Sequence, residues 1–311
     1  MDRLKSLSVF VRVVELGSFA AAAEALDLSA PMVGRHISSL EAYLGSRLLN
    51  RSTRRQSLTE LGSAYYERSR LVLAEFDAAN SLAADFAGTP RGRLRVTMPS
   101  LLGRHCLAPS FISMSENYPE LEIDLSFSDR FADLIDDGFD LAIRTGTLAD
   151  RAGTVARVVG RQPMVVCAAP SYISQFGTPG HPHDLMAHNA VVYCRTGRVS
   201  PFLFPRACET PLEVSPRHRI RLDDMDVMAD AAAGGHGVAW LPFWLVRKRL
   251  ISGELVRLLP DYPPFLYDVH AFWLQTPQLP LKVRLAIERI ASDLPRLMVM
   301  DTPVIGRGSN V

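Results

Sequence analysis

The strongest constraint on the fold of this chain is one uninterrupted helical segment that divides it into two unequal parts. From Thr59 to Phe86 there is no proline, the only glycine lies in the first turn, and Thr59 is a favourable N-cap. Apolar residues recur along the segment at helical spacing. At 1.5 Å per residue this helix is about 40 Å long, more than the short segment before it could cover. We therefore expect the helix to pair with a second copy of the chain.

The residues before this segment have the pattern of three short helices. From Leu7 to Val14 the apolar residues fall at positions i, i+3, i+4 and i+7 of an amphipathic helix. A second, alanine-rich helix is predicted from Phe19 to Leu26, and its small side chains allow another backbone to approach closely. A third helix begins at Ser29, carries Pro31 in its first turn and ends before Gly45.

The third helix has one face for the core and one for solvent. Its apolar positions follow a period of 3.6 residues, so we expect the polar set between them to face outward. That outward set is Met32, Arg35, His36 and Ser39. The segment that follows, from Ala42 to Thr59, holds four arginines and no acidic residue. The net charge of the whole chain is only +1, so this segment is a local concentration of positive charge.

Together these features predict a winged helix-turn-helix, with the motif from Phe19 to Ser38. The third helix would enter the major groove, and the arginine-rich hairpin would lie along flanking phosphates. Arg35 can donate two hydrogen bonds to guanine, and Met32 can touch a thymine methyl group. The residues expected to contact double-stranded DNA are Ser29, Pro31, Met32, Arg35, His36, Ser39, Arg51, Thr53, Arg54 and Arg55. A solvated helix face beside a charged loop is the alternative, and the co-occurrence of helix start, polar face and wing favours DNA binding.

Beyond a linker at Gly88 to Gly92, short apolar runs alternate with helical segments. The predicted strands are Leu94–Met98, Leu121–Phe127, Asp140–Ile143, Met164–Ala168, Val238–Leu241 and Val269–Leu274. The predicted helices are Cys106–Asn117, Phe131–Asp137, Met225–Ala233 and Lys282–Leu294. This alternation is typical of an α/β fold with a largely parallel sheet. Its length predicts two lobes with a cleft between them.

Ordered motifs in the first 62 residues resemble the headpiece signature of the LysR-type transcriptional regulators. They are Phe19-Ala-x-Ala-Ala-x-x-Leu26, Leu28-Ser-Ala-Pro31, Arg35-His-Ile37, Leu40-Glu41, Leu44-Gly45, Leu48-Leu-x-Arg51 and Leu58-Thr-Glu-Leu-Gly62. Later segments resemble the effector domain of the same family: Asp140-Leu-Ala-Ile-Arg144, Ala169-Pro170, the glycine-rich run from Ala232 to Pro242, and Gly253-Glu-Leu-Val256. Many members have Gln, Ser and Gln where this chain has Ala30, Gly34 and His36, so the family's base preference does not carry over at those positions.

The resemblance implies an α/β protein with an N-terminal all-α winged helix-turn-helix and a C-terminal two-lobed domain like type 2 periplasmic binding proteins. The implied boundaries are 1–59 for the DNA-binding domain, 60–87 for the linker dimerisation helix, 88–92 for a hinge, 93–300 for the effector-binding domain and 301–311 for a flexible tail. Lobe I would comprise about 93–161 and 267–297, and lobe II about 162–266. The implied assembly is a homodimer or homotetramer on an inverted-repeat operator, with RNA polymerase as a further partner.

The predicted effector site lies where the first strand of the α/β domain ends. Ser100 stands there before a helix whose free N–H groups favour an anion. The resemblance places the ligand at the same point. The residues expected at the site are Ser100, Leu101, Ser128, Arg144 and Thr196. We therefore expect a small, anionic effector. Its identity, the target genes and the direction of regulation do not follow from the sequence.

Other classes of site are disfavoured. The histidines in the run from His181 to His188 read as solvated turn residues rather than metal ligands. The run Gly234-Gly-His-Gly237 lacks the Lys-Ser/Thr of a phosphate loop and fits a tight helix-to-strand turn. The four cysteines form no C-x-x-C pair, and no apolar stretch is long enough for a membrane span. A cytoplasmic, reduced protein without metal or cofactor is expected.

The leading function is a sequence-specific transcriptional regulator modulated by a small molecule. The alternative is a small-molecule binding protein or an enzyme built on the α/β lobes, without DNA recognition. The sequence has no G-x-S-x-G, no P-loop, no H-E-x-x-H and no dinucleotide-binding glycine fingerprint after a strand. An enzyme is therefore the weaker hypothesis.

Overall fold

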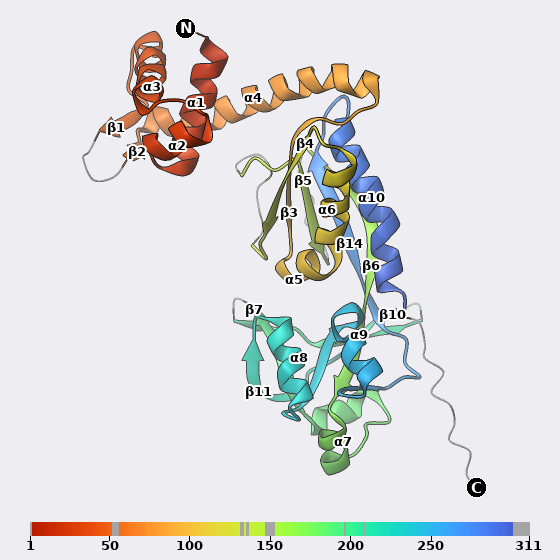
Figure 1. The fold of residues 1–311 in the computed structure, drawn as a ribbon. Coiled ribbons are helices and arrows are strands. Elements are labelled where there is room, and N and C mark those ends of the chain that lie inside the picture. Colours follow the sequence, from red (N-terminus) through yellow and green to blue (C-terminus); the bar gives the residue numbers. More distant parts are fainter. Residues whose placement is uncertain are drawn as a thin grey trace.

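A computed structural model of the chain describes residues 2–51, 56–130, 134, 137–146, 153–195, 197–207 and 209–300. A small helical headpiece is joined by one long helix to an α/β domain in two parts (Figure 1). The headpiece and the α/β domain have separate hydrophobic cores. The fold class predicted from the sequence is confirmed.

The headpiece consists of three helices and a hairpin, as predicted. They are α1 (Arg3–Leu16), α2 (Phe19–Ala25), α3 (Ala30–Leu44), β1 (Leu49–Arg51) and β2 (Gln56–Leu58). The two strands pair in antiparallel register. The helices are short and cross closely, because Ala22 and Ala23 of α2 are buried where a larger side chain would separate the helices.

Local signals end the helices and join them to the hairpin. Gly45 ends α3 in the left-handed conformation, with φ of 67°, as glycine does at many helix C-termini. The carboxylate of Glu41 is buried and accepts hydrogen bonds from the backbone N–H groups of Leu48 (2.9 Å) and Leu49 (3.2 Å). The Glu41 side chain of α3 therefore fixes the position at which the wing begins. Phe10 lies fully buried at the centre of this small core.

The long helix α4 (Glu60–Ala87) follows directly and confirms the predicted helix within one residue at each end. Thr59 caps it, since the hydroxyl oxygen accepts from the backbone N–H of Gly62 at 2.8 Å. Gly62 is required by close packing: a Cβ there would lie 2.0 Å from the carbonyl oxygen of Leu48. The start of α4 is thereby pressed against the wing.

The α/β domain is built on one sheet of ten strands within the described residues, ordered β11-β7-β12-β6-β14-β5-β3-β4, with β13 beside β6 and β8 beside β7. These strands are β3 (Gly92–Met98), β4 (Leu121–Phe127), β5 (Leu141–Thr145), β6 (Thr154–Ala168), β7 (Asn189–Arg195), β8 (Arg198–Val199), β11 (Arg217–Leu222), β12 (Val238–Pro242), β13 (Val256–Leu258) and β14 (Phe265–Leu274). A separate hairpin is formed by β9 (Phe202–Arg206) and β10 (Glu209–Val214). The helical elements are α5 (Ser100–Leu102), η1 (Gly103–Leu107), α6 (Ala108–Asn117), α7 (Pro170–Phe176), η2 (Pro182–Ala187), α8 (Met225–Ala233), α9 (Phe243–Ser252) and α10 (Leu281–Met298).

The prediction of a largely parallel sheet is wrong, because the sheet is mixed. Parallel pairs occur within each part, between β3 and its neighbours β4 and β5, and between β7 and its neighbours β11 and β12. Between the parts, β6 and β14 form a long antiparallel pair that runs through both (Figure 1). Only the last third of β6, Met164–Ala168, was predicted from the sequence, because the N-terminal part of the strand is largely exposed. These two long strands make the two lobes one continuous sheet.

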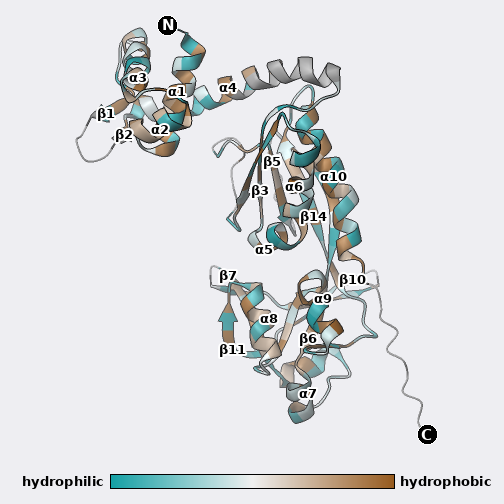
Figure 2. Ribbon diagram, in the orientation of Figure 1, coloured by the Kyte–Doolittle hydropathy of each residue, from teal (hydrophilic) through white to brown (hydrophobic). Residues whose placement is uncertain are grey.

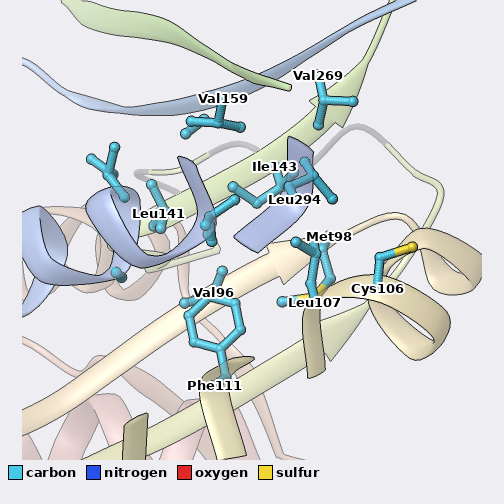
Figure 3. Close-up of a cluster of buried hydrophobic side chains, with 14 of the residues drawn as sticks. Val96, Met98, Cys106, Leu107, Phe111, Leu141, Ile143, Val159, Val269 and Leu294 are labelled. Atoms are coloured by element: carbon cyan, nitrogen blue, oxygen red, sulfur yellow. The ribbon is translucent and has the colours of Figure 1, made fainter. Parts of the chain in front are cut away.

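Lobe I, as we use the term, is the part around β3, β4 and β5. Its core lies between the sheet and the helices α6 and α10, where Val96, Leu107, Phe111 and Leu294 meet (Figure 3). Along α10 hydrophilic and hydrophobic residues alternate (Figure 2). Such amphipathic helices cover one face of a sheet and turn the other toward water. The predicted helix Phe131–Asp137 lies mainly outside the described residues.

Lobe II is the part around β7, β11 and β12, with α8 and α9 on one side. The predicted glycine turn between α8 and β12 is confirmed. Gly235 has φ of 81°, and a Cβ on Gly237 would lie 2.6 Å from the carbonyl oxygen of Asn189. Several elements of lobe II, namely β7 to β11, β13, α7 and α9, were not predicted, because they are short or partly exposed and lack a long periodic pattern.

Candidate DNA-binding surface and effector cleft

The outward face of α3 differs by about one residue from the predicted one. Met32 (42% exposed) and Arg35 are exposed as predicted, and Pro31 and Ser38 are exposed beside them. Pro31, Arg35 and Ser38 follow each other at steps of four and three, so they form one stripe along the helix. Ser38 was missed, although this spacing from Pro31 could have revealed it. Ser29 lies exposed at the N-cap of α3.

His36 does not lie on this face, and the prediction that it faces outward is wrong. Its ring is 4% exposed, and Nδ1 lies 3.0 Å from the hydroxyl oxygen of Ser6 in α1. The Ser6 hydroxyl donates to the carbonyl oxygen of Asp2 at 2.9 Å, so it accepts from an Nδ1–H of His36. Burial, with a smaller contribution from Lys5, lowers the pKa of His36. A neutral imidazole therefore joins α3 to α1.

Ser39, also predicted to face DNA, is only half exposed. It lines a groove of about 360 Å³ between α1, α3 and α4, together with Tyr43, Tyr65 and Val72. Ser39 thus lies at the border between the exposed stripe and the groove beside the linker helix. For His36 and Ser39 alike, the apolar periodicity of α3 fixes the phase of the helix only to within about one position.

The wing follows α3 at the expected place. Arg47 is exposed at its start, and Arg51 ends β1. The Asn50 side-chain amide donates to the Ser57 hydroxyl and to the Leu58 carbonyl, both at 3.1 Å, and ties the two strands together. Thr53, Arg54 and Arg55 lie outside the described residues. The described part of the wing thus presents a hairpin at the N-terminal end of α4.

A candidate effector site is a cleft of about 460 Å³ between lobes I and II. Lobe I contributes Pro99 to Leu102, Asp129 and Arg144 to Gly146; lobe II contributes Tyr193, Arg195, Ser200, Phe202, Asp223 to Met225 and Trp240; the connecting strands and their surroundings contribute Gln162, Met164, Pro242, Trp244 and Tyr267. The predicted residues Ser100, Leu101 and Arg144 are therefore brought together.

Arg144, the last residue but one of β5, is a buried cation in the wall of this cleft. The residue is 6% exposed, and its guanidinium donates to the carbonyl oxygens of Ile143 (2.7 Å) and Arg130 (3.0 Å) and to the Thr97 hydroxyl (3.1 Å). Nε is buried without a hydrogen-bond partner. Burial lowers the pKa of Arg144 to about 10, with Asp129 opposing the shift, so the group is cationic at neutral pH. The fixed positive charge of Arg144 in the cleft wall is suited to attracting an anion.

Ser100 opens a continuous helical run through α5, η1 and α6 and is half exposed in the cleft. Ser100 was predicted to stand before a helix, and the helical run does begin there. The helix itself had been predicted to begin only at Cys106, six residues later. Ser128, also predicted at the site, is not among the residues that line this cleft; its hydroxyl accepts from the backbone N–H of Arg130 at 3.2 Å in the turn after β4. Thr196 lies outside the described residues.

The aromatic wall of the cleft was missed by the sequence analysis. The rings of Phe202 and Trp240 are stacked with centroids 5.7 Å apart, and Tyr267 lies 5.9 Å from Trp240. Arg195 of lobe II donates to the backbone carbonyl of Asp129 in lobe I and bridges the two lobes. These residues lie far apart in the sequence and share no motif, so no local signal could have grouped them.

The histidines and cysteines outside the cleft have partners or surroundings of their own in the described residues. No group of three or more His, Cys, Asp or Glu side chains there is placed to share a metal ion. His181 instead accepts from the backbone N–H of His183 and stacks on its ring. Burial raises the pKa of the Cys106 and Cys167 thiols to about 12. None of the helices in the described ranges has the length and apolar character that a membrane span requires.

Comparison with known proteins covers both parts of the chain. Residues 4–63 match the family described as bacterial regulatory helix-turn-helix protein, lysR family, and residues 87–295 match the LysR substrate binding domain. The HTH-type transcriptional activator AaeR of Escherichia coli (strain K12) is 36% identical over 309 residues, which cover 99% of each chain.

Solved structures agree with the sequence relatives. CrgA, a LysR-type transcriptional regulator from Neisseria meningitidis, aligns with a TM-score of 0.58 and 30% identity, over 93% of this chain and 98% of that one. The full-length Vibrio cholerae virulence activator AphB aligns with a TM-score of 0.57 and 27% identity, over 94% and 99%. With the exposed face of α3, the wing and the interlobe cleft, these matches show that the chain belongs to the LysR family, as a DNA-binding transcriptional regulator with an effector-binding domain.

Proposed function

We propose that the chain recognises a specific DNA sequence through the exposed stripe of α3 and holds flanking phosphates with the wing. The observation that carries this proposal is Arg35, an exposed arginine in the N-terminal half of α3, where a recognition helix reaches base edges. Arg35 would read guanine, Met32 a thymine methyl group, and Ser29, Pro31 and Ser39 the borders of the contact. Arg51, Thr53, Arg54 and Arg55 would contact the backbone. His36 has no role in this proposal because it is buried.

The bound form in this proposal is a homodimer or homotetramer on an inverted repeat. Leu61, Val72 and Phe76 of α4 are 44%, 50% and 44% exposed, an apolar surface that pairing of two linker helices would cover. Two-fold symmetry then places half-sites about 34 Å or a multiple apart. The proposed domain boundaries follow the same division: 1–59, 60–87 and 93–300 on either side of a hinge at 88–92.

The effector in this proposal is a small anion. Its charged group lies at Ser100 and Arg144, where a helix N-terminus and a hydroxyl can donate to it and the fixed guanidinium supplies positive charge. Its apolar part packs on the wall formed by Trp240 and Tyr267. We assign no enzymatic role to the cleft, and we place the protein in the cytoplasm with its DNA. Contact with RNA polymerase is part of the proposal for the DNA-bound form.

Selection of DNA from a random pool by the full-length protein tests the DNA half of the proposal. The selected sites should be inverted repeats, and their affinity should fall linearly with salt on a log–log scale because phosphate contacts release counterions. Enrichment of no sequence, with no retention on DNA even at low salt, would contradict it and would favour a binding protein or enzyme built on the lobes.

Thermal-shift screening of a panel of small carboxylic acids tests the effector half. An acid that raises the melting temperature of the wild type should have a weaker effect on Ser100→Ala, whereas the variant should keep its fold and still bind the operator without the acid, since the headpiece itself is unaltered. An unchanged midpoint for the acid in Ser100→Ala would move the pocket elsewhere. Loss of operator binding without the acid would show that Ser100 is structural.

A further inference from the structure

Arg70 of α4 lies where the linker helix meets lobe I. Its side chain is only 6% exposed, and its guanidinium carbon lies 5.5 Å from the ring centroid of Tyr66 on the same helix. On the other side it meets the turn before β5, since a Cβ added at Gly138 would lie 2.5 Å from Nη2 of Arg70. The guanidinium is therefore enclosed between the linker helix and the α/β domain.

The Gly138 turn is held from the lobe I side by Arg95 of β3. Nη1 of Arg95 donates to the carbonyl oxygen of Gly138 at 3.0 Å, and it would lie 2.7 Å from the same added Cβ. The Asp140 carboxylate accepts from the backbone N–H of Arg95 at 2.8 Å. Gly138 has φ of 67°, a conformation that favours glycine. A side chain at position 138 would therefore be disfavoured twice, by the backbone conformation and by the two arginines that occupy the space.

The contact is packed but poorly bonded. Nη1 and Nη2 of Arg70 are buried without a hydrogen-bond partner, and the Glu67 carboxylate approaches Nη1 only to 3.8 Å. Buried N–H groups without acceptors are unfavourable, so this arrangement persists only while the surrounding packing holds it. A small displacement of the Gly138 turn therefore changes the free energy of the contact directly.

Two strands lead from this contact to the effector cleft. β5 begins just after the Gly138 turn and ends at Arg144 and Thr145 in the cleft wall. β3 runs parallel to it from Arg95 and ends just before Ser100. On the far side of Arg70, Tyr66 packs against Phe10 in the headpiece core, with ring centroids 6.4 Å apart. A continuous series of packed groups thus joins cleft and headpiece.

We propose that the contact of Arg70 with the Gly138 turn couples the effector cleft to the orientation of the winged helix-turn-helix, with Arg70 as the positioning residue. The proposal rests on the proposed function of the two sites and adds the route between them. A change at the cleft end of β5 or β3 moves the Gly138 turn, the turn moves Arg70, and α4 with the headpiece follows. The coupled element is a stiff strand pair with one loosely bonded contact at its end.

The test uses the dependence of affinity on half-site spacing, which reports the orientation of the two headpieces in a dimer. The full-length protein first selects its operator, and the half-sites are then moved apart or together by single base pairs. Arg144→Met serves as the perturbation of the cleft. In the wild-type background it should change relative affinities across the series by about 2- to 30-fold. In the Arg70→Met or Gly138→Ala background its effect should shrink to within about twofold.

Gly177→Ala is the matched control, because Gly177 has φ of 84° but no atom within 4 Å of an added Cβ. It should retain the wild-type response to Arg144→Met. If Arg70→Met does not fold, Arg70→Lys replaces it, since it keeps the charge but loses the planar fork.

The inference is overturned if Arg144→Met leaves the spacing profile of the wild type unchanged. It is also overturned if the effect of Arg144→Met persists in the Arg70 and Gly138 variants, or if Gly177→Ala removes that effect as fully as they do. A wild type that selects no operator overturns the proposed function itself, and this inference with it.

Discussion

The reading face of α3 and the effector cleft are built in opposite ways. The face of α3 comes from one short helix, its side chains are exposed, and Arg35 is free to adapt to a base pair. The cleft gathers residues from Pro99 to Tyr267, and its cation, Arg144, is buried and fixed by three acceptors before any ligand arrives. A local site can be read from sequence spacing, whereas an assembled site depends on how the sheet brings strand ends together.

The first prediction, with the largest change in the free energy of unfolding, concerns whether the headpiece and the α/β domain unfold independently. Phe10 and Phe111 are both buried, one in each core, so replacing either with alanine should cost about 3–5 kcal/mol. Phe10→Ala should lower only the headpiece transition in calorimetry, and Phe111→Ala only that of the α/β domain. If either variant lowered the transition temperatures of both domains equally, the two cores would unfold together, and the two sites could not be treated as separate units.

The next prediction separates base reading from phosphate binding within the local site. Arg35→Ala should lose about 1–3 kcal/mol at the selected operator and relax base preference, because its bidentate contact to guanine is lost. Arg54→Ala should weaken binding to all sequences alike and reduce the salt slope by about one unit. Titrations of operator and random DNA at several salt concentrations measure both. The assignment fails if the two variants lower specific and random binding by the same factor.

A smaller effect concerns the pH dependence of the headpiece. Burial lowers the pKa of His36 in the folded state, so the unfolded state binds more protons as the pH falls below about 6.5. The contribution of neutral His36 is fully present above that pH and is lost progressively as the pH falls toward the folded pKa. Melting curves of the wild type and His36→Gln at pH 7.5 and 5.5 should show a steeper loss for the wild-type headpiece. Parallel losses in the two proteins would exclude His36 as the cause.

The smallest predicted effect is a gain. Gly34 lies inside α3, and an added Cβ would meet no atom within 4 Å. Gly34→Ala should therefore stabilise the headpiece by about 1 kcal/mol through helix propensity alone. Thermal unfolding measures this, and a competition titration with operator DNA measures its cost. A gain in stability with a loss of operator affinity would mean that Gly34 allows close approach to DNA. If stability does not rise, the prediction that a methyl group fits at position 34 is wrong.

The secondary structure was predictable where a periodic pattern was long or a cap was strong. The three headpiece helices, α4, β3, β4 and α8 all lie where the sequence placed them, because caps and apolar periods are local properties. The strands β7 and β11 escaped prediction, and so did the N-terminal part of β6, which is largely exposed. Their position is set by pairing with strands distant in the sequence, which a local pattern does not encode.

The same division holds for individual site residues. Local spacing is enough to predict a winged helix-turn-helix with Arg35 on its outer face, a long linker helix and the placement of Ser100 at the start of a helix. Two further features come from long-range packing: His36 turns inward to Ser6, and Arg144 lies beside an aromatic wall. Periodicity fixes a helix face only to within about a residue, and packing of α3 on α1 chose the final phase. Residues far apart in the chain meet in the cleft because β6 and β14 join both lobes in one sheet, and that long-range pairing leaves no trace in local spacing.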